Sequence, residues 1–401
     1  MAKNRSIHPL LVAAASPFQA SPAPGVTHRG SRSRVDLNGP WERYLNGSLY
    51  DVIQAPGSLR PLGSFRLQRS FLLPKLAARQ RAFLCFDAVT YHGRAFANGT
   101  ELGAMGSYVP YEFEFTRHAE EGSNTVEVVL SDLIPEPSGA GKAEIAVGLN
   151  PGWEGYGGII RDVYVELRPG AFIENIRFAY KLNGGYTKAS CRAQVFLSAA
   201  EPASGRLELS LFHGHSTVAR LSQPVELPAG SSEVEAVFDT DAPPLWSPEQ
   251  PNLHQLAAHL ETGLGADHYA CRTGFRDLQI RGRAFELNGR ALVLNGVCRH
   301  DMWKDQGFTL TPAQMEQDMR MIKALGANFV RLVHYPHHRY IIDLADELGL
   351  LVSEEPGYWN MDFQTMPRAQ VEAGLRILER IIRRDWNSPA VFAWLLANEC
   401  N

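Results

Sequence analysis

The hydrophobic pattern of this chain changes near residue 287, and this change limits its fold more than any other feature. After residue 287, short apolar runs alternate with longer stretches in which apolar residues recur every three or four positions. Strands alternating with helices indicate a parallel sheet, and the sequence has room for four such βα units. The expected strands are residues 291–294, 329–333, 350–352 and 391–397, and the expected helices are residues 312–325, 338–348 and 369–386.

The first of these helices carries clear start and stop signals. Thr311 is a good N-cap, Pro312 suits the first helical position, and Gln314 can complete a capping box. Gly326 then ends this helix, and Gly349 ends the next one.

Before residue 287 the pattern is that of β-structure. Residues 35–168 contain several short strands between turns, which predicts an all-β sandwich. Residues 169–276 form a second β-rich unit of immunoglobulin-like size. Residues 1–34 are rich in Ser, Pro, Ala and Arg without a period, and we expect a disordered or targeting leader there. The expected strands in the two β-units are residues 64–73, 82–89, 94–97, 124–130, 162–167, 193–198, 207–212, 234–238 and 254–260.

Charge and composition narrow the choice of partners. The net charge is −4 without a basic stripe, so we expect no nucleic-acid partner. No apolar run approaches the roughly 20 residues that a membrane span needs. The five cysteines are scattered without a CxxC motif, so neither a disulfide framework nor a zinc site is expected, and no other cofactor is indicated. A short apolar run at residues 9–15 leaves both a cytoplasmic and a secreted or periplasmic location open.

Polar side chains follow each strand of the strand–helix part. In a βα-barrel, catalytic groups lie at the carboxyl ends of the strands, which share one rim. Taken singly, such residues can also have a purely structural role. His334 could be a core histidine, Arg331 a structural partner of Glu355, and Glu354 a solvated carboxylate. Four coincident strand ends favour a common site instead. The strand-end residues are His300, Asp301, Arg331, His334, Tyr335, Glu354, Glu355, Asn398 and Glu399.

The sequence motifs around these strand ends resemble those of glycoside hydrolase family 2, which includes β-galactosidases, β-glucuronidases and β-mannosidases. The family's G-V-N-R-H-E is similar to residues 296–301, its R-T-S-H-Y-P to residues 331–336, and its W-S-x-x-N-E to residues 394–399. The resemblance extends from about residue 36 to the end. Further matching phrases lie at residues 38–41, 153–163, 245–251, 346–355 and 384–391.

The resemblance implies a multidomain β plus α/β architecture. Residues 35–168 would form a sugar-binding jelly-roll β-sandwich, residues 169–276 an immunoglobulin-like β-sandwich, and residues 277–401 the first half of a (β/α)8 TIM barrel. It also implies a retaining exo-β-glycosidase that acts on a β-linked glycoside or oligosaccharide, with the oligomeric state open. Glu399 would be the acid/base, and the substrate-binding residues would be Asn398, His300, Asp301, Arg331, His334, Tyr335 and Glu355.

Two features leave the reaction open. Cys298 replaces the family's usual Asn and Asp301 its usual Glu, so the substrate class is not fixed. The family's nucleophilic glutamate follows the seventh barrel strand, so no residue here takes that role, and we expect a truncated chain that is inactive as written. Two alternatives remain: a non-catalytic carbohydrate-binding protein with a vestigial half barrel, and a different hydrolase that pairs Glu355 with Glu399. The DNA beyond codon 401 would separate the first reading from the carbohydrate-binding one.

Overall fold

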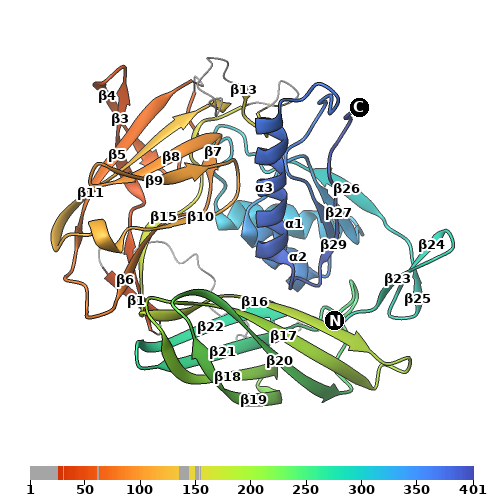
Figure 1. Cartoon of the computed structure of the whole chain (residues 1–401). Helices are drawn as coiled ribbons and strands as arrows, with labels where there is room; N and C mark the ends of the chain where they lie inside the picture. The colour runs from red at the N-terminus through yellow and green to blue at the C-terminus, as the bar shows by residue number, and fades with distance from the viewer. Residues whose placement is uncertain (1–25, 30, 61–62, 135–143, 150–152, 154) are drawn as a thin grey trace, which may run out of the picture.

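The computed structural model describes residues 26–29, 31–60, 63–134, 144–149, 153 and 155–401. Two β-sandwiches and a strand–helix unit make up this part of the chain (Figure 1). Most of the predicted leader, residues 1–25 and 30, lies outside the described residues. The leader's predicted end at residue 34 comes too late, because strand β2 already begins at Arg32 and pairs with β1.

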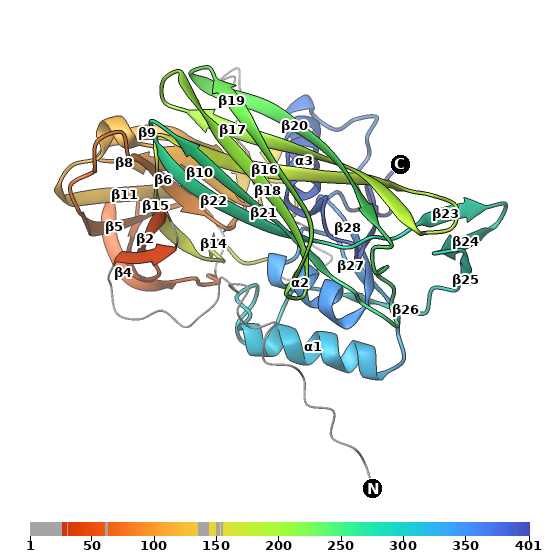
Figure 2. The ribbon, with the colours of Figure 1, turned by 90° about the horizontal axis from the view of Figure 1, so that it is seen from below.

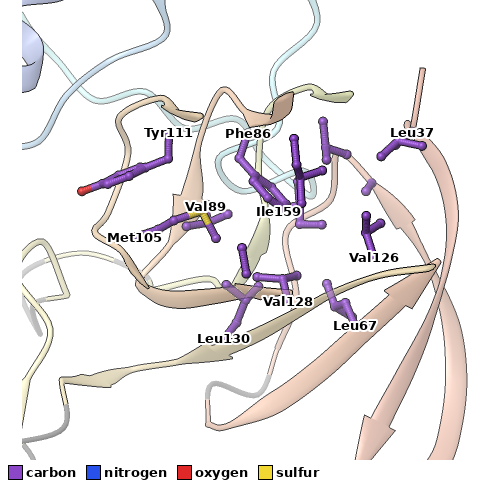
Figure 3. Close-up of a cluster of buried hydrophobic side chains, with 14 of the residues drawn as sticks. Leu37, Leu67, Phe86, Val89, Met105, Tyr111, Val126, Val128, Leu130 and Ile159 are labelled. Carbon is purple, nitrogen blue, oxygen red and sulfur yellow. The ribbon is translucent and has the colours of Figure 1, made fainter. Parts of the chain in front are cut away.

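The first sandwich packs a five-stranded sheet against a six-stranded one. Its core consists of alternate apolar side chains from both sheets, among them Leu67, Phe86 and Val128 (Figure 3). The first sheet is ordered β1 (Val26–Arg29), β2 (Arg32–Asp36), β15 (Val163–Arg168), β6 (Arg81–Phe86), β10 (Tyr111–Glu114). The second is ordered β4 (Ser48–Ala55), β3 (Gly39–Leu45), β5 (Phe65–Leu73), β11 (Gly122–Ser131), β8 (His92–Ala97), β9 (Thr100–Met105).

Short elements complete this sandwich at its ends. The single-turn 3-10 helix η2 (Thr116–His118) follows β10. Two further pairs are antiparallel: β7 (Val89–Thr90) with β14 (Gly158–Ile159), and β12 (Leu133–Ile134) with β13 (Glu144–Ile145).

The second sandwich has seven strands in two antiparallel sheets, as in an immunoglobulin-like domain of the constant type. All four strands predicted in this region are present, and each is longer than its apolar run. One sheet is ordered β16 (Ala171–Leu182), β17 (Lys188–Ala199), β20 (Gly230–Asp241). The other is ordered β19 (Ser216–Leu227), β18 (Ala203–His213), β21 (His254–Thr262), β22 (Gly265–Thr273).

The strand–helix unit is a four-stranded parallel sheet with three helices. The capping box that starts α1 is present, because Gln314 N–H donates to Thr311 Oγ1 and Thr311 N–H donates to Gln314 Oε1. The elements alternate as β26 (Gly296–Arg299), α1 (Pro312–Ala324), β27 (Phe329–Leu332), α2 (Arg339–Leu348), β28 (Leu351–Glu354), α3 (Arg368–Asp385) and β29 (Val391–Trp394).

The prediction of a first barrel strand at residues 291–294 is wrong. Residues 290–292 instead close a small antiparallel sheet of β23 (Leu278–Arg281), β24 (Ala284–Leu287) and β25 (Arg290–Leu292). Val293 is 70% exposed, so an apolar run that reads as a buried strand lies at the surface. The first parallel strand follows at Gly296, where Gly296 and Val297 pair with Phe329 and Val330 of β27.

Both sandwiches pack against the strand–helix unit, as two perpendicular views show (Figures 1 and 2). Ile377 and Ile381 of α3 join the core of the first sandwich. Trp386, which follows α3, donates its indole N–H to Ile176 O of β16. Trp246, from the segment that connects β20 to β21 in the second sandwich, is fully buried in the core of the strand–helix unit. None of the helices described by the structure is long and apolar enough to cross a membrane.

Candidate active site

The predicted site residues follow the carboxyl ends of four neighbouring parallel strands. His300 and Asp301 come after β26, His334 and Tyr335 after β27, and Glu355 directly after β28. Asn398 and Glu399 follow β29 after residues 395–397, which belong to no strand. Because the four strands are hydrogen-bonded in chain order, these residues gather at one edge of the sheet.

Glu355 joins two of these strands to one another. Its side chain is completely buried and both carboxylate oxygens are occupied. Arg331 Nε donates to Oε1 at 2.6 Å, and His334 Nδ1 lies 2.8 Å from Oε2. A carboxylate held in this way orients its two partners and has no exposed oxygen with which to attack a substrate. The geometry therefore disfavours the alternative in which Glu355 pairs with Glu399 as a catalytic carboxylate.

Arg331 also contacts a residue that follows the fourth strand, β29. Its Nη2 donates to Asn398 Oδ1 at 2.8 Å, which fixes the orientation of the Asn398 amide. The amide N–H groups of Asn398 thus remain as donors for another partner. The backbone of Asn398 is also held, because Asn398 N–H donates to Tyr358 O and Asn360 N–H donates to Asn398 O.

Glu399 differs from Glu355 in its surroundings. The side chain is exposed, and within the described ranges it makes neither a hydrogen bond nor an ion pair. Its backbone has a φ of +53°, in the left-handed region that non-glycine residues seldom adopt. Backbone strain of this kind concentrates at functional sites, where surrounding structure holds it in place.

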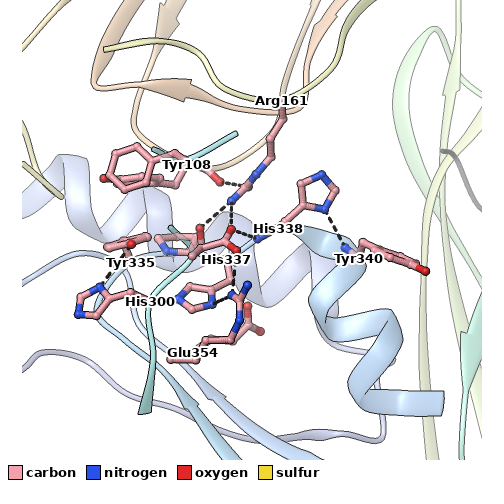
Figure 4. A network of polar contacts seen from close by, with 12 residues as sticks. Tyr108, Arg161, His300, Tyr335, His337, His338, Tyr340 and Glu354 are labelled. Atoms are coloured by element: carbon pink, nitrogen blue, oxygen red, sulfur yellow. Dashed lines mark hydrogen bonds and ion pairs between the residues drawn. The ribbon is translucent and has the colours of Figure 1, made fainter. Parts of the chain in front are cut away.

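Asp301, predicted to bind substrate, lies beneath the site in a buried ion-pair network. Its Oδ1 accepts from Arg299 Nη1 at 2.8 Å, and its Oδ2 accepts from His338 N–H at 2.9 Å and Arg161 Nη2 at 3.4 Å. Burial alone raises the pKa of Asp301, but the charges of Arg299, His337 and Arg161 outweigh it and hold the pKa well below its usual range. Asp301 is thus a buried anion that positions its neighbours, of which Arg161 and His338 are labelled in Figure 4.

Tyr335 is also buried, although the sequence predicts contact with substrate. Its ring stacks on Tyr108 of the first sandwich with ring centroids 4.6 Å apart, and its hydroxyl lies 3.4 Å from His300 Nδ1 (Figure 4). Tyr335 is therefore placed to orient His300. The imidazole of His300 is only partly buried, and its pKa is lowered by burial and by the neighbouring His334 and Arg299.

The first sandwich contributes side chains that the sequence analysis did not assign to the site. The ring of Trp153 lies 5.8 Å from that of His300, 6.0 Å from His334 and 5.8 Å from Trp359, measured between centroids. Arg161 reaches Asp301 from the same sandwich. Trp153 and Arg161 both lie in the family-like motif at residues 153–163. This motif is the one feature of the sequence that could have indicated their place at the site.

Two acidic residues of the matching phrases are structural. Glu354 was expected to be solvated, but its side chain is completely buried and Oε2 accepts from Arg384 Nη2 at 3.0 Å. Burial, and then the charge of Asp385, raise the pKa of Glu354 well above its usual range. Asp346 accepts from Ser388 Oγ at 2.5 Å and from Ala390 N–H at 3.0 Å, which joins α2 to the start of β29.

The site as a whole can bind a polar ligand beside a carboxylate. Arg331 and His334 are partly exposed, Asn398 offers its amide, and Glu399 lies next to it in the chain. In the described part of the chain no three His, Cys, Asp or Glu side chains are grouped so that they could hold a metal ion.

Comparison with known proteins shows which protein family the chain resembles in sequence. Residues 171–276 match the model of "Glycosyl hydrolases family 2", and residues 278–401 match "Glycosyl hydrolases family 2, TIM barrel domain". A β-galactosidase of Aeromonas hydrophila is 31% identical, with 84% of this chain and 33% of that protein covered. A β-galactosidase of Vibrio cholerae is 29% identical, with 88% of this chain and 35% of that protein covered.

Solved structures agree with the fold. A β-glucuronidase of Bacteroides uniformis is 23% identical with a TM-score of 0.82, covering 92% of this chain and 47% of that chain. A β-galacturonidase of Eisenbergiella tayi, solved with glycerol, is 26% identical with a TM-score of 0.77, covering 92% of this chain and 65% of that chain.

The chain spans about a third of the length of the curated relatives that it matches. Within that span it has both domain matches, the two β-sandwiches and the parallel strands whose ends carry the residues predicted from the family's phrases. The chain belongs to glycoside hydrolase family 2.

Proposed function

We propose that the protein is a retaining exo-β-glycosidase whose acid/base catalyst is Glu399. The observation that supports this most directly is the end of β29, where an exposed Glu399 follows an Asn398 that is held by Arg331. Arg331 is in turn fixed by the buried Glu355, so the position of Asn398 rests on a second, rigid layer. Catalytic groups act best when supporting hydrogen bonds hold their neighbours in place.

In this proposal Glu399 protonates the glycosidic oxygen as the bond to the leaving group breaks. The same carboxylate then removes a proton from the water that hydrolyses the glycosyl-enzyme intermediate. The Asn398 amide would donate to the sugar hydroxyl next to the anomeric carbon, a hydrogen bond that strengthens in the transition state. His300 and His334 would contact other hydroxyls at the same rim. We assign no nucleophile within these 401 residues.

The substrate class that we propose is a terminal β-galactoside or β-glycuronide. The names of the relatives support this, since they include β-galactosidases, a β-glucuronidase and a β-galacturonidase. Arg331 and the two histidines are suited to polar hydroxyls and to a carboxylate alike, so the site chemistry fits both groups. Initial rates on aryl β-galactoside, β-glucuronide and β-mannoside would separate the candidates.

The acid/base role is tested by Glu399→Gln in a full-length version of the protein. We expect turnover to fall by about 10²–10⁴-fold on phenyl glycosides, whose leaving oxygen needs a proton, and far less on dinitrophenyl glycosides. Glu379→Gln is the matched control, because Glu379 is an exposed carboxylate on α3. Equal losses on both leaving groups would contradict the assignment.

A further inference from the structure

A cleft of about 510 Å³ lies between the two β-sandwiches. One wall comes from Arg79 in the turn before β6, from Arg81 at the start of β6, and from η2, including Arg117 and His118. The other wall comes from the end of β17 and the start of β20 at Gly230. None of the lining residues belongs to the strand–helix unit, so the cleft is separate from the candidate active site. Its volume lies in the range of ligand pockets, roughly 300–1,000 Å³.

The lining carries more positive than negative charge. Three arginines and His118 face the cleft, and Glu114 is the one acidic side chain among the described lining residues. Arg81 is already committed, because its Nε and Nη2 donate to the two oxygens of Glu114 at 2.9 and 2.6 Å and its Nη1 donates to Ser198. The Arg81–Glu114 pair is therefore close to neutral and leaves Arg79 and Arg117 as the excess charge.

The two arginines are held to different degrees. Arg79 Nε lies 3.2 Å from Glu201 Oε1 in an ion pair whose side chains are 55% and 53% exposed, which contributes little, and Arg79 Nη1 donates to Gly263 O at 2.9 Å. Arg117 is exposed and takes part in no ion pair among the residues that the structure covers. The guanidinium group of Arg117 and the Nη2 group of Arg79 are thus available to a ligand that enters the cleft.

The composition of the lining points to a charged ligand. Neutral sugar rings commonly stack on aromatic side chains, and no aromatic residue lines the described walls of this cleft. A planar guanidinium group instead matches the paired oxygens of a carboxylate, sulfate or phosphate. The opposite wall has an open backbone at Gly230, where a side-chain atom would meet nothing within 4 Å.

We propose that this cleft binds a small acidic sugar, with Arg117 and Arg79 holding its carboxylate or sulfate group. The inference does not depend on the proposed glycosidase activity, because no residue is shared between the two sites. It adds a second binding site for saccharides that bear an anionic group.

Calorimetric titration with three related sugars tests the proposal. Galactose 6-sulfate and galacturonate should show binding that Arg117→Glu removes, and galactose, which lacks the anionic group, should show none that this variant removes. Binding should weaken as ionic strength rises, because part of the attraction is between exposed charges. Inorganic sulfate at the same concentration should bind more weakly than galactose 6-sulfate, and equal binding would show that the cleft takes the anion alone and would overturn the sugar part of the proposal.

Arg117→Glu and Arg117→Gln connect the binding to the cleft. We expect the affinity for galactose 6-sulfate to fall by about tenfold or more in both, the loss of one charged hydrogen bond. Arg220→Glu makes the same charge change on β19, and Arg220 is exposed outside the cleft, so this control should bind normally. Full affinity in both Arg117 variants, or equally strong binding of neutral galactose that Arg117→Glu removes, would overturn the proposal.

Discussion

Arg331 is the residue through which the site residues of three strands are connected. It donates to Glu355 and to Asn398, and it is 30% exposed while Glu355 is fully buried. The sequence left two roles open for it, a structural partner of Glu355 and a member of the sugar site. The contacts are compatible with both, because one guanidinium group serves the buried carboxylate and the rim amide together.

Arg331→Ala separates these two roles. We expect kcat/KM of a full-length enzyme to fall by about tenfold or more, since Asn398 loses the hydrogen bond that orients it. Stability should fall by about 1–3 kcal/mol, because the buried Glu355 then keeps only His334 as a partner. Steady-state kinetics and urea unfolding measure the two effects.

The double variant Arg331→Ala with Glu355→Gln is the control for this prediction. The neutral amide removes the uncompensated buried charge, so stability should recover toward that of the original protein. Activity should stay low, because nothing restores the contact to Asn398. Recovery of activity together with stability would favour a purely structural pair.

At the scale of single elements, the end of α2 is held more tightly than that of α1. Gly349 caps α2 with a φ of +68°, and Gly326 follows α1 with a φ of +83°. A side-chain atom at Gly349 would lie 2.4 Å from Pro248 O, in the segment that connects β20 to β21 of the second sandwich. At Gly326 the same atom would meet nothing within 4 Å.

These two glycines therefore form a matched pair. Gly326→Ala should lower the free energy of unfolding by about 1 kcal/mol, which is the cost of holding an alanine in the left-handed conformation. Gly349→Ala should cost clearly more, because either α2 or the Pro248 backbone must move as well. Chemical unfolding of both variants measures the difference. Equal losses would mean that the junction at Pro248 yields easily.

At the scale of the whole molecule, Arg161 connects the first sandwich to the strand–helix unit. Its side chain is buried and donates to Tyr108 O at 2.6 Å, to Pro336 O at 3.0 Å and to Asp301 Oδ2 at 3.4 Å. Burial lowers the pKa of Arg161 to about 10, which still leaves it charged at neutral pH. The contact thus places a positive charge between the two units, beside Tyr108 and His338 (Figure 4).

Arg161→Met should weaken the coupling between these units. We expect a loss of about 3–5 kcal/mol, the usual result of removing one partner from a buried charge network. Differential scanning calorimetry should then resolve an earlier transition for the strand–helix unit. Arg220→Met, at an exposed position on β19, should leave the profile unchanged. A single unshifted transition in Arg161→Met would show that packing alone couples the units.

Local sequence predicted most elements because their signals are local. A capping box, a terminal glycine and an apolar period each depend on a few neighbouring residues, and α1, α2 and α3 begin within a residue of their predicted starts. The strand at residues 291–294 failed for the same reason. Its apolar run carries no information about which sheet it joins, and β25 pairs with β24 in an antiparallel hairpin instead of joining the parallel sheet.

What the sequence by itself determined about this protein is the order of its domains, its family and the set of polar residues at the strand ends. Only the tertiary structure decided which of those residues are buried beneath the site and which remain at its rim. Glu355, Asp301 and Tyr335 turn inward and support the site, while Arg331, His334, Asn398 and Glu399 remain at the rim. Trp153 and Arg161 join them from the first sandwich. The physical reason is that burial and pairing join residues far apart in the chain, from 24 positions for Arg331 and Glu355 to 140 for Arg161 and Asp301, which no local pattern records.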